Sequence, residues 1–230
     1  RLMEVLGRSP YGLFVFNCHA PDAGNIEVLI SRGTKDQQER FLRPLLAGEV
    51  RSCFSMTEPE HAGSNPVVLS TTAVREGDDY VIDGHKWFTS GADGAAFAIV
   101  MAVTNPEADN PYERASQILV PTDTPGFTVR ETLRKLGLHT SPTGWLVFDR
   151  CRVPKDFTIG HPHRGYYYHT QNLLEERLIG GVCCLALAAL VLDDTIAHLR
   201  RRRAYGRPLS ALQVVRHRIA EMAAEIEMAR

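Results

Sequence analysis

Two nearby segments decide how this chain is interpreted: Cys53-Phe-Ser-Met-Thr-Glu-Pro-Glu-His-Ala-Gly-Ser-Asn65 and Gly84-His-Lys-Trp-Phe-Thr-Ser-Gly91. Each combines aromatic and hydroxyl side chains with glycines, on a predicted strand and the loop beside it. This combination suits a flat ring, because aromatic side chains stack on such a ring and glycines let main-chain donors approach it. In isolation, the apolar residues of either segment would more readily be interpreted as ordinary β-sheet core.

Short β-rich runs surround these two segments, from Val50 to Pro154, and turn residues separate them. Asp83-Gly84 is typical of a two-residue hairpin turn. Short strands at this regular spacing predict a small antiparallel barrel or sandwich. The runs are residues 52–56, 67–75, 80–82, 86–89, 97–104, 116–120, 127–131 and 145–148.

Helical patterns flank the β-rich region on both sides. Before it, we predict the end of a helix near the N-terminus, a short helix over residues 25–32, and a helix capped by Thr34. After it, we predict a long helix over residues 164–203 and an amphipathic helix that begins at Ser210. The fold class is therefore α+β: N-terminal helices (1–50), a central β-domain (51–158) and the first part of a C-terminal long-helix bundle (159–230).

Residues 178–192 of the long helix are apolar on almost every side. A membrane-spanning helix needs about 20 apolar residues, and acidic residues stand at both ends of this stretch. We therefore expect a helix that is buried on most sides and does not span a membrane. Such a helix requires more apolar partners than this chain offers, which favours a homo-oligomer.

Composition excludes several classes of function. The net charge of −1 and the pI of about 6.8 provide no general attraction to nucleic acid or to an anionic membrane. Five cysteines without a CxxC motif favour a reducing compartment over a disulfide framework or a zinc site, and no secretory signal is evident. The scattered histidines predict no metal site, and the absence of GxGxxG argues against a nicotinamide enzyme.

Together, the two opening segments resemble the flavin-cradling segments of the acyl-CoA dehydrogenase family, in the form carried by its eukaryotic multidomain branch. Other segments similar to family signatures occur in the expected order before and after these two, at residues 15–25, 117–127, 147–154 and 202–209. The resemblance implies an FAD enzyme that oxidises an acyl-CoA to the trans-2-enoyl-CoA and passes electrons to an electron-transfer flavoprotein. It also implies a homodimer or homotetramer in the bacterial cytoplasm or the mitochondrial matrix.

The resemblance assigns cofactor-binding roles to matching positions of this sequence. Within the β-domain these are Phe54, Met56, Thr57, Gly63, Ser64, Phe88, Thr89 and Ser90. Arg202, Tyr205 and Gln213 match residues that contact the flavin of a neighbouring subunit. The chain has one residue more than the common family form after Pro59 and one fewer around Trp87, so either Trp87 or Phe88 could take the stacking position.

The resemblance also assigns the chemistry. Glu176 matches the catalytic base in the long-chain and isovaleryl type of the family, and Arg177 and Ser64 match substrate-binding residues. An exposed helical glutamate paired with an arginine is an equally good interpretation of Glu176. Two other functions remain open: a truncated, non-catalytic piece of such an enzyme, and a relative that catalyses flavin monooxygenation or nitroalkane oxidation.

Overall fold

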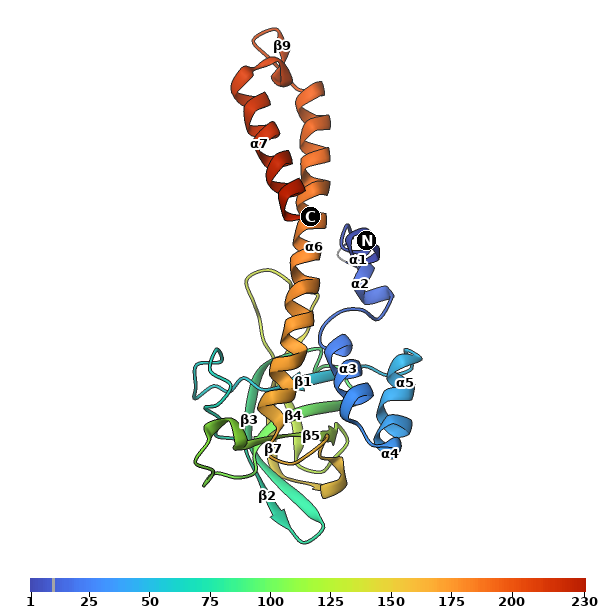
Figure 1. The fold of residues 1–230 in the computed structure, drawn as a ribbon, viewed down its shortest axis with the longest axis vertical. Coiled ribbons are helices and arrows are strands. Elements are labelled where there is room, and N and C mark those ends of the chain that lie inside the picture. The colour runs from blue at the N-terminus through green and yellow to red at the C-terminus, as the bar shows by residue number, and fades with distance from the viewer. Residues whose placement is uncertain (10) are drawn as a thin grey trace. The chain divides into compact units, whose positions relative to one another are not determined.

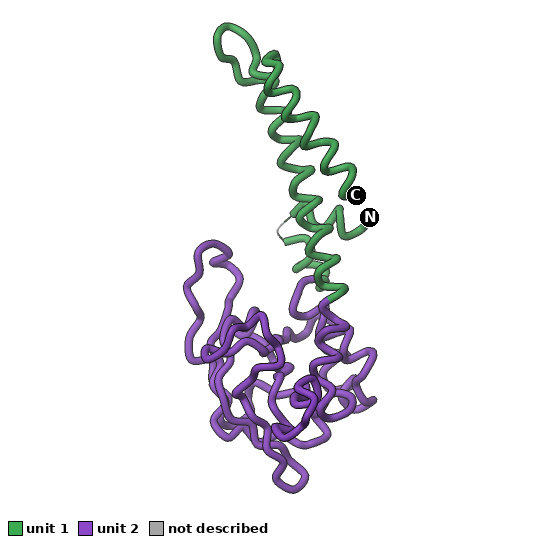
Figure 2. Tube along the Cα trace, turned by 60° about the vertical axis from the view of Figure 1, so that its left-hand side comes forward, with its two compact units in different colours: residues 1–18, 174–230 green, residues 19–173 purple. Residues whose placement is uncertain are grey.

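The computed structural model describes residues 1–9 and 11–230. The protein has the predicted α+β fold, in which helices precede and follow one curled β-sheet (Figure 1). Residues 19–173 form one compact unit, and residues 1–18 together with 174–230 form a second, coloured separately in Figure 2. The domain limits expected at residues 50 and 158 stay a prediction.

The N-terminal region consists of short helices. Their bounds are α1 Leu2–Leu6, α2 Gly12–Val15, α3 Asp22–Arg32, α4 Lys35–Gln37, the π-helical turn η1 Gln38–Leu42 and α5 Arg43–Leu46. The predicted cap is confirmed, because Thr34 Oγ1 accepts the Gln37 N–H at 3.2 Å and Gln37 Oε1 accepts the Thr34 N–H at 3.1 Å. Gln37 Nε2 also donates to the carbonyls of Asp156 and Thr158, which ties α4 to the sheet region.

One seven-stranded sheet forms the centre of the larger unit. Its strands are β1 Ser52–Ser55, β2 Thr72–Glu76, β3 Asp79–Ser90, β4 Phe97–Val103, β5 Ala115–Pro121, β6 Phe127–Thr132 and β7 Thr143–Pro154. The spatial order is β1-β4-β2-β3-β7-β6, with β5 beside β4. Most neighbours are antiparallel, but β1 and β2 each pair with β4 in parallel. Short 3-10 turns follow β4 and β7, at η2 Pro111–Glu113 and η3 Lys155–Phe157.

Strand β4 separates two hydrophobic cores. Successive side chains of a strand point to opposite faces, so an uninterrupted apolar run must be covered on both. Ala98 and Val100 belong to the core enclosed by the curled sheet, which also contains Ile82. Phe97 and Ile99 belong to the other core, in which helices α3 and α5 and the turn η1 cover the sheet. Helices α3 and α5 and the turn η1 are therefore integral to the unit that carries the sheet.

The hairpin predicted at Asp83-Gly84 is wrong. These residues lie inside the continuous strand β3, at a shift in its pairing with β7, and the β2–β3 turn is at Gly77-Asp78. Gly84 has φ +147°, and an added Cβ would lie 2.5 Å from Thr71 Oγ1. Glycine is therefore needed at a β-bulge, where positive φ and close backbone approach occur as they do in a turn.

The C-terminal region begins with the predicted long helix, α6 Gly165–Arg201. The short strands β8 Arg203–Ala204 and β9 Arg207–Pro208 form a hairpin, and a 3-10 turn, η4 Leu209–Ala211, follows. The last helix, α7 Gln213–Ala229, therefore begins later than the predicted Ser210. At the start of α6, Gly165 packs against β5 so closely that an added Cβ would lie 3.0 Å from the Ala115 carbonyl oxygen.

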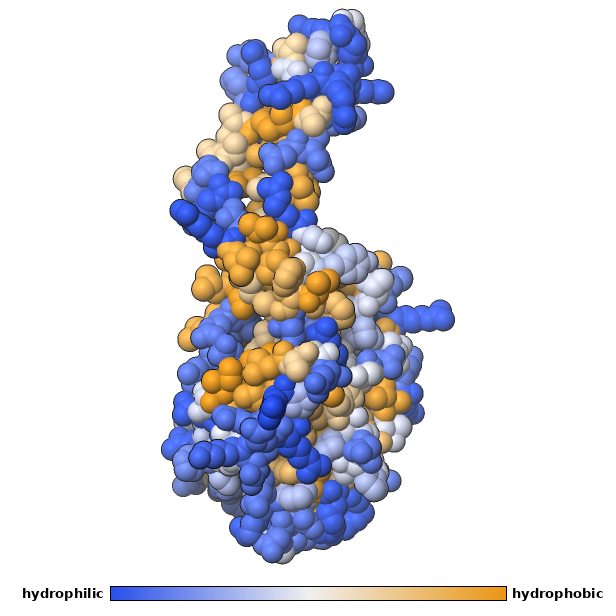
Figure 3. Space-filling view, turned by 90° about the vertical axis from the view of Figure 1, so that its right-hand side faces the viewer, coloured by the Kyte–Doolittle hydropathy of each residue, from blue (hydrophilic) through white to orange (hydrophobic). Residues whose placement is uncertain are grey.

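Few apolar side chains of α6 are covered by the described part of the chain, so the expected burial on most sides is wrong for this chain by itself. Leu174, Leu178, Leu187 and Val191 are exposed, and hydrophobic atoms gather on the helical region in Figure 3. The most apolar 18-residue window of α6 has a mean hydropathy of 1.9, and 6% of it is buried. By length and composition alone, α6 could cross a membrane. This is weak evidence for a membrane-spanning helix, because core helices of soluble proteins pass the same test.

Candidate active site

After β1 ends, the chain continues alongside β3, and this brings residues 53–65 and 84–91 together. The Trp87 N–H donates to the Thr57 carbonyl oxygen at 2.9 Å. Phe54, within β1, is partly buried, and its ring is stacked on the imidazole of His169 at 5.4 Å with an interplanar angle of 11°. Met56 and Thr57 therefore lie directly beside the part of β3 that carries Trp87 and the residues after it.

The loop after Thr57 folds back onto the Thr57 side chain. A Cβ added to Gly63 would lie 2.7 Å from Thr57 Cγ2 and 3.1 Å from its Oγ1. Real Cβ contacts are not that short, so Gly63 is required for the loop to approach this closely. Ser64, the next residue, is exposed. The predicted residues Thr57, Gly63 and Ser64 are thus gathered in one turn of the chain.

Phe88 has a strained backbone in the middle of β3. Its φ is +50°, and the pairing of β3 with β7 changes register between Lys86 and Thr89. The left-handed conformation costs a non-glycine residue roughly 1–2 kcal/mol, and such strain is found preferentially at functional sites. The side chain is 53% exposed, and its ring lies 4.8 Å from that of Trp87. The bulge therefore directs an aromatic side chain out of the sheet.

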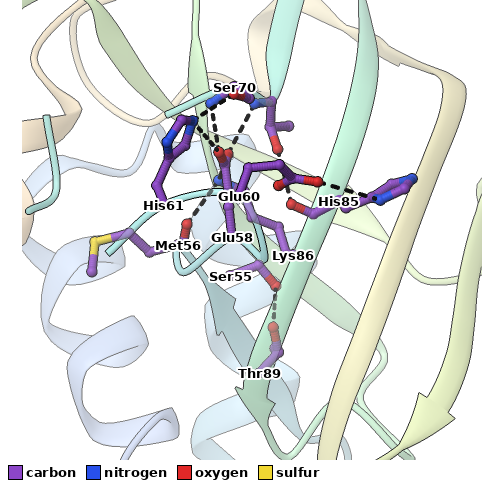
Figure 4. Close-up of polar contacts among 10 residues, drawn as sticks. Ser55, Met56, Glu58, Glu60, His61, Ser70, His85, Lys86 and Thr89 are labelled. Carbon is purple, nitrogen blue, oxygen red and sulfur yellow. Dashed lines mark hydrogen bonds and ion pairs between the residues drawn. The ribbon is translucent and has the colours of Figure 1, made fainter. Parts of the chain in front are cut away.

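Thr89 and Ser90 differ in their access to solvent. Thr89 is buried, and its Oγ1 lies 3.3 Å from Ser55 Oγ of β1 (Figure 4). Ser90 is exposed. An exposed aromatic ring, neighbouring hydroxyl groups and a glycine-dependent loop are the groups that a flat heteroaromatic ring needs for stacking and hydrogen bonding. The residues present in this unit therefore fit a flavin ring.

Glu176 and Arg177 lie on α6. Burial raises the pKa of the Glu176 carboxyl above its ordinary value. Over residues 1–9 and 11–230 no ion pair involves Glu176, so the expected alternative of a glutamate paired with an arginine receives no support. Arg177 is exposed. A partly buried, unpaired carboxylate with a raised pKa has the properties that a general base requires.

The remaining predicted cofactor residues lie where α6 ends and α7 begins. Arg202 follows α6, Tyr205 is 96% exposed in the β8–β9 hairpin with φ +51°, and Gln213 is the first residue of α7. At about 1.5 Å of rise per residue, α6 holds Glu176 and Arg202 about 39 Å apart. Arg202, just after the C-terminal end of α6, is therefore far from Glu176, the candidate base near the start of the same helix.

Sequence reasoning did not single out three residues that the structure brings beside the predicted site residues. Lys86 and Glu58 form a buried ion pair with 2.8 Å between Nζ and Oε1, in the midst of the predicted cofactor residues. Both stand in the quoted segments, but charged side chains are almost never fully buried, so their pattern predicted surface positions. His169, which contacts Phe54, had no distinguishing signal among the scattered histidines.

A separate cavity of about 630 Å³ lies elsewhere in the same unit. None of the predicted site residues lines it, and it runs between α4, η1, the β2–β3 hairpin and the segment after β7. Charged and aromatic side chains are mixed in its wall, including Arg40, Arg75, Asp156 and Phe157. No group of acidic, histidine and cysteine residues suited to a metal ion occurs in the described part of the chain. The residues predicted to contact the flavin therefore do not form this cavity.

Comparison with known families decides the relationship. Residues 53–151 match the family model "Acyl-CoA dehydrogenase, middle domain", and residues 163–230 match "Acyl-CoA dehydrogenase, C-terminal domain". The chain belongs to the acyl-CoA dehydrogenase family. The middle-domain match contains the segments 53–65 and 84–91, and the C-terminal match contains Glu176 and the β8–β9 hairpin.

Individual acyl-CoA dehydrogenases are similar over nearly the whole chain. The mouse "Acyl-CoA dehydrogenase family member 10" is 37% identical over 100% of this chain, which spans 22% of that protein. A putative acyl-CoA dehydrogenase from Mycobacterium abscessus has a TM-score of 0.93 at 39% identity, covering 99% of this chain and 56% of its own. A glutaryl-CoA dehydrogenase from Mycobacterium smegmatis, solved in complex with FADH2, has a TM-score of 0.81 at 32% identity, covering 89% of this chain and 51% of its own. The chain thus spans about half the length of these solved relatives.

Proposed function

We propose that this chain is part of an FAD-dependent acyl-CoA dehydrogenase that converts a saturated acyl-CoA thioester into the trans-2-enoyl-CoA. The observation that carries the proposal is the meeting of the Thr57 loop with the β3 bulge, which presents Phe88 beside two neighbouring hydroxyl groups. Membership of the family and its FADH2-bound relative support the choice of cofactor.

Each residue of the β-domain has a distinct role in this proposal. FAD, when bound, accepts the hydride that leaves the β-carbon of the substrate. Phe88 packs against the ring system, and the Thr57 and Thr89 hydroxyls bond to its polar edge. The loop at Gly63 and Ser64 supplies main-chain and hydroxyl groups to the cofactor and to the thioester side of the substrate. These contacts orient the reacting atoms and exclude water from them.

Glu176 is the proposed base. Its carboxylate takes the α-proton of the thioester as hydride leaves the β-carbon, so that the two departures leave a carbon–carbon double bond. A carboxylate that burial makes more basic is better suited to this proton than an exposed one. Arg177 is the next residue of α6, and its proposed role is to provide a positive charge for the CoA portion of the substrate.

The proposal includes a second subunit. An extended dinucleotide with its flavin ring near Glu176 is much shorter than the about 39 Å that separates Glu176 from Arg202 along α6. Arg202, Tyr205 and Gln213 therefore serve the flavin of another subunit, in a homodimer or homotetramer. The exposed apolar side chains of α6 support further helical partners. We also propose an electron-transfer flavoprotein as acceptor, and a cytoplasmic or mitochondrial-matrix location.

The visible spectrum of the purified full-length protein tests the proposal. We expect a yellow protein whose colour bleaches on anaerobic addition of an acyl-CoA, and a Glu176→Gln variant that keeps the colour but does not bleach. A colourless protein that takes up no added FAD would contradict the proposal, as the non-catalytic alternative predicts. Oxygen consumption coupled to substrate turnover would instead indicate a monooxygenase or nitroalkane-oxidase type of reaction. Bleaching by the Glu176→Gln variant would remove Glu176 as the base.

A further inference from the structure

Strand β3 carries a lysine that is entirely withdrawn from solvent. Lys86 has an exposed fraction of 0%, and its ammonium donates to the Glu58 carboxylate at 2.8 Å and to the Met56 carbonyl at 2.9 Å. Burial lowers the pKa of Lys86 to about 8, in spite of the opposing effect of Glu58. Because a buried ion pair is seldom more stabilising than apolar side chains of the same size, stability is a poor explanation for its presence here.

Glu58 is buried to the same degree and joins three segments of the chain. Its exposed fraction is 1%, and besides Lys86 it accepts the N–H groups of Ser70 at 2.5 Å and Thr71 at 2.9 Å (Figure 4). Burial opposes its ionisation, but Lys86 and these backbone donors more than offset that effect, so the pKa of Glu58 lies below its ordinary value. The carboxylate therefore links the loop after β1, the segment that leads into β2, and β3.

The two ends of this ion pair lie next to the proposed flavin contacts. Thr57 stands between Met56 and Glu58, and Lys86 binds a group on each side of it. Lys86 is also paired with Leu146 of β7 immediately before the register shift that places Phe88 at positive φ. The ion pair thus fixes the distance between two parts of the backbone: the loop around Thr57 and the part of β3 that leads into the bulge at Phe88.

We propose that Glu58 and Lys86 are positioning residues of the flavin site, which hold the Thr57 loop and the Phe88 bulge at the separation that the flavin ring requires. This inference rests on the proposed function, since it concerns the same cofactor. Neither charge is consumed in the reaction. This role explains why a lysine occupies a buried position of β3 at which an apolar side chain would also pack.

The experiment measures FAD in the full-length holoenzyme. The variant Lys86→Met keeps an unbranched side chain that is one atom shorter and removes its charge. Glu58→Gln neutralises the partner with almost no change in shape. The matched control is Ile82→Ala, which removes a fully buried side chain of the same strand without touching the pair. For each protein we measure the dissociation constant of FAD, the visible spectrum of the bound flavin and the midpoint of urea unfolding.

We expect both charge variants to bind FAD roughly 10- to 100-fold more weakly, by analogy with the loss found when residues that orient metal ligands are removed, and to shift the flavin spectrum. Ile82→Ala should lower the unfolding midpoint and leave the spectrum and affinity unchanged. If Lys86→Met does not fold, Glu58→Gln decides by the same criterion. Charge variants that match Ile82→Ala in affinity and spectrum would overturn the inference while leaving the proposed function intact. Wild-type protein that binds no FAD would overturn the proposed function, and the inference with it.

Discussion

The strain at Phe88 can be measured by comparing two substitutions at the same position. Phe88→Ala and Phe88→Gly both remove the ring, which is 53% exposed, but only glycine adopts φ +50° without a steric penalty. Val74 of β2 is a matched control: it is 58% exposed, and its φ is not positive. At each position the alanine and glycine variants differ only by the Cβ, so the comparison between the two positions reports the difference in backbone conformation.

The expected magnitudes follow from two opposing effects. Relief of the left-handed conformation favours glycine over alanine by roughly 1–2 kcal/mol, and the greater freedom of glycine in the unfolded chain disfavours it by roughly 0.5–1 kcal/mol. Phe88→Gly should therefore be more stable than Phe88→Ala by about 0.75 kcal/mol, within a range of roughly 0–1.5 kcal/mol. At Val74 the order should reverse, with glycine less stable by about 0.5–1 kcal/mol.

Urea unfolding at equilibrium measures both differences, provided that the dependence on urea is the same for the four variants. Subtracting the difference at Val74 from that at Phe88 cancels the unfolded-state effect and leaves the strain alone. If glycine were less stable than alanine by the same amount at both positions, Phe88 would carry no strain. The Phe88 backbone would then not be held in a strained conformation for a ligand.

Three further predictions concern single residues. Gly126→Ala should lower the free energy of unfolding by more than about 2 kcal/mol, because φ is +88° there and the added Cβ would lie 2.1 Å from a carbonyl oxygen of β7. Gly48 is the control: its φ is +72° and an added Cβ would have nothing within 4 Å, so Gly48→Ala should lower the free energy of unfolding by only about 1 kcal/mol in the same urea unfolding measurement. Burial raises the pKa of the Cys53 thiol to about 12, so iodoacetamide at pH 8 should modify Cys53 only after unfolding. Mass spectrometry of the native and the unfolded protein checks this, and modification of Cys53 in the native protein would contradict it. Protonated Glu176 cannot accept a proton, so the rate of anaerobic flavin bleaching should fall as the pH is lowered through the raised pKa of Glu176. Stopped-flow measurement of the rate against pH checks this, and a fall in rate centred at the ordinary pKa of glutamate would contradict it.

Local features of the chain were predictable because their causes are local. The Thr34 cap depends on residues three positions apart, and the long helix α6 follows from a stretch without proline. Most strands likewise appear where apolar residues alternate between turn signals. The segments around Thr57 and Phe88 could also be recognised as a candidate site, since their composition is visible in the sequence.

Contacts between distant segments decided the rest. Gly84 has the same local signal in a hairpin turn and in a bulge, and only the approach of Thr71 and the pairing with β7 distinguish them. Lys86 is buried because Glu58 and the Met56 carbonyl, 28 and 30 positions away, satisfy its ammonium. Sequence periodicity reports what one element prefers, whereas the burial of a charge and the strain at Phe88 depend on partners that only the folded chain brings together.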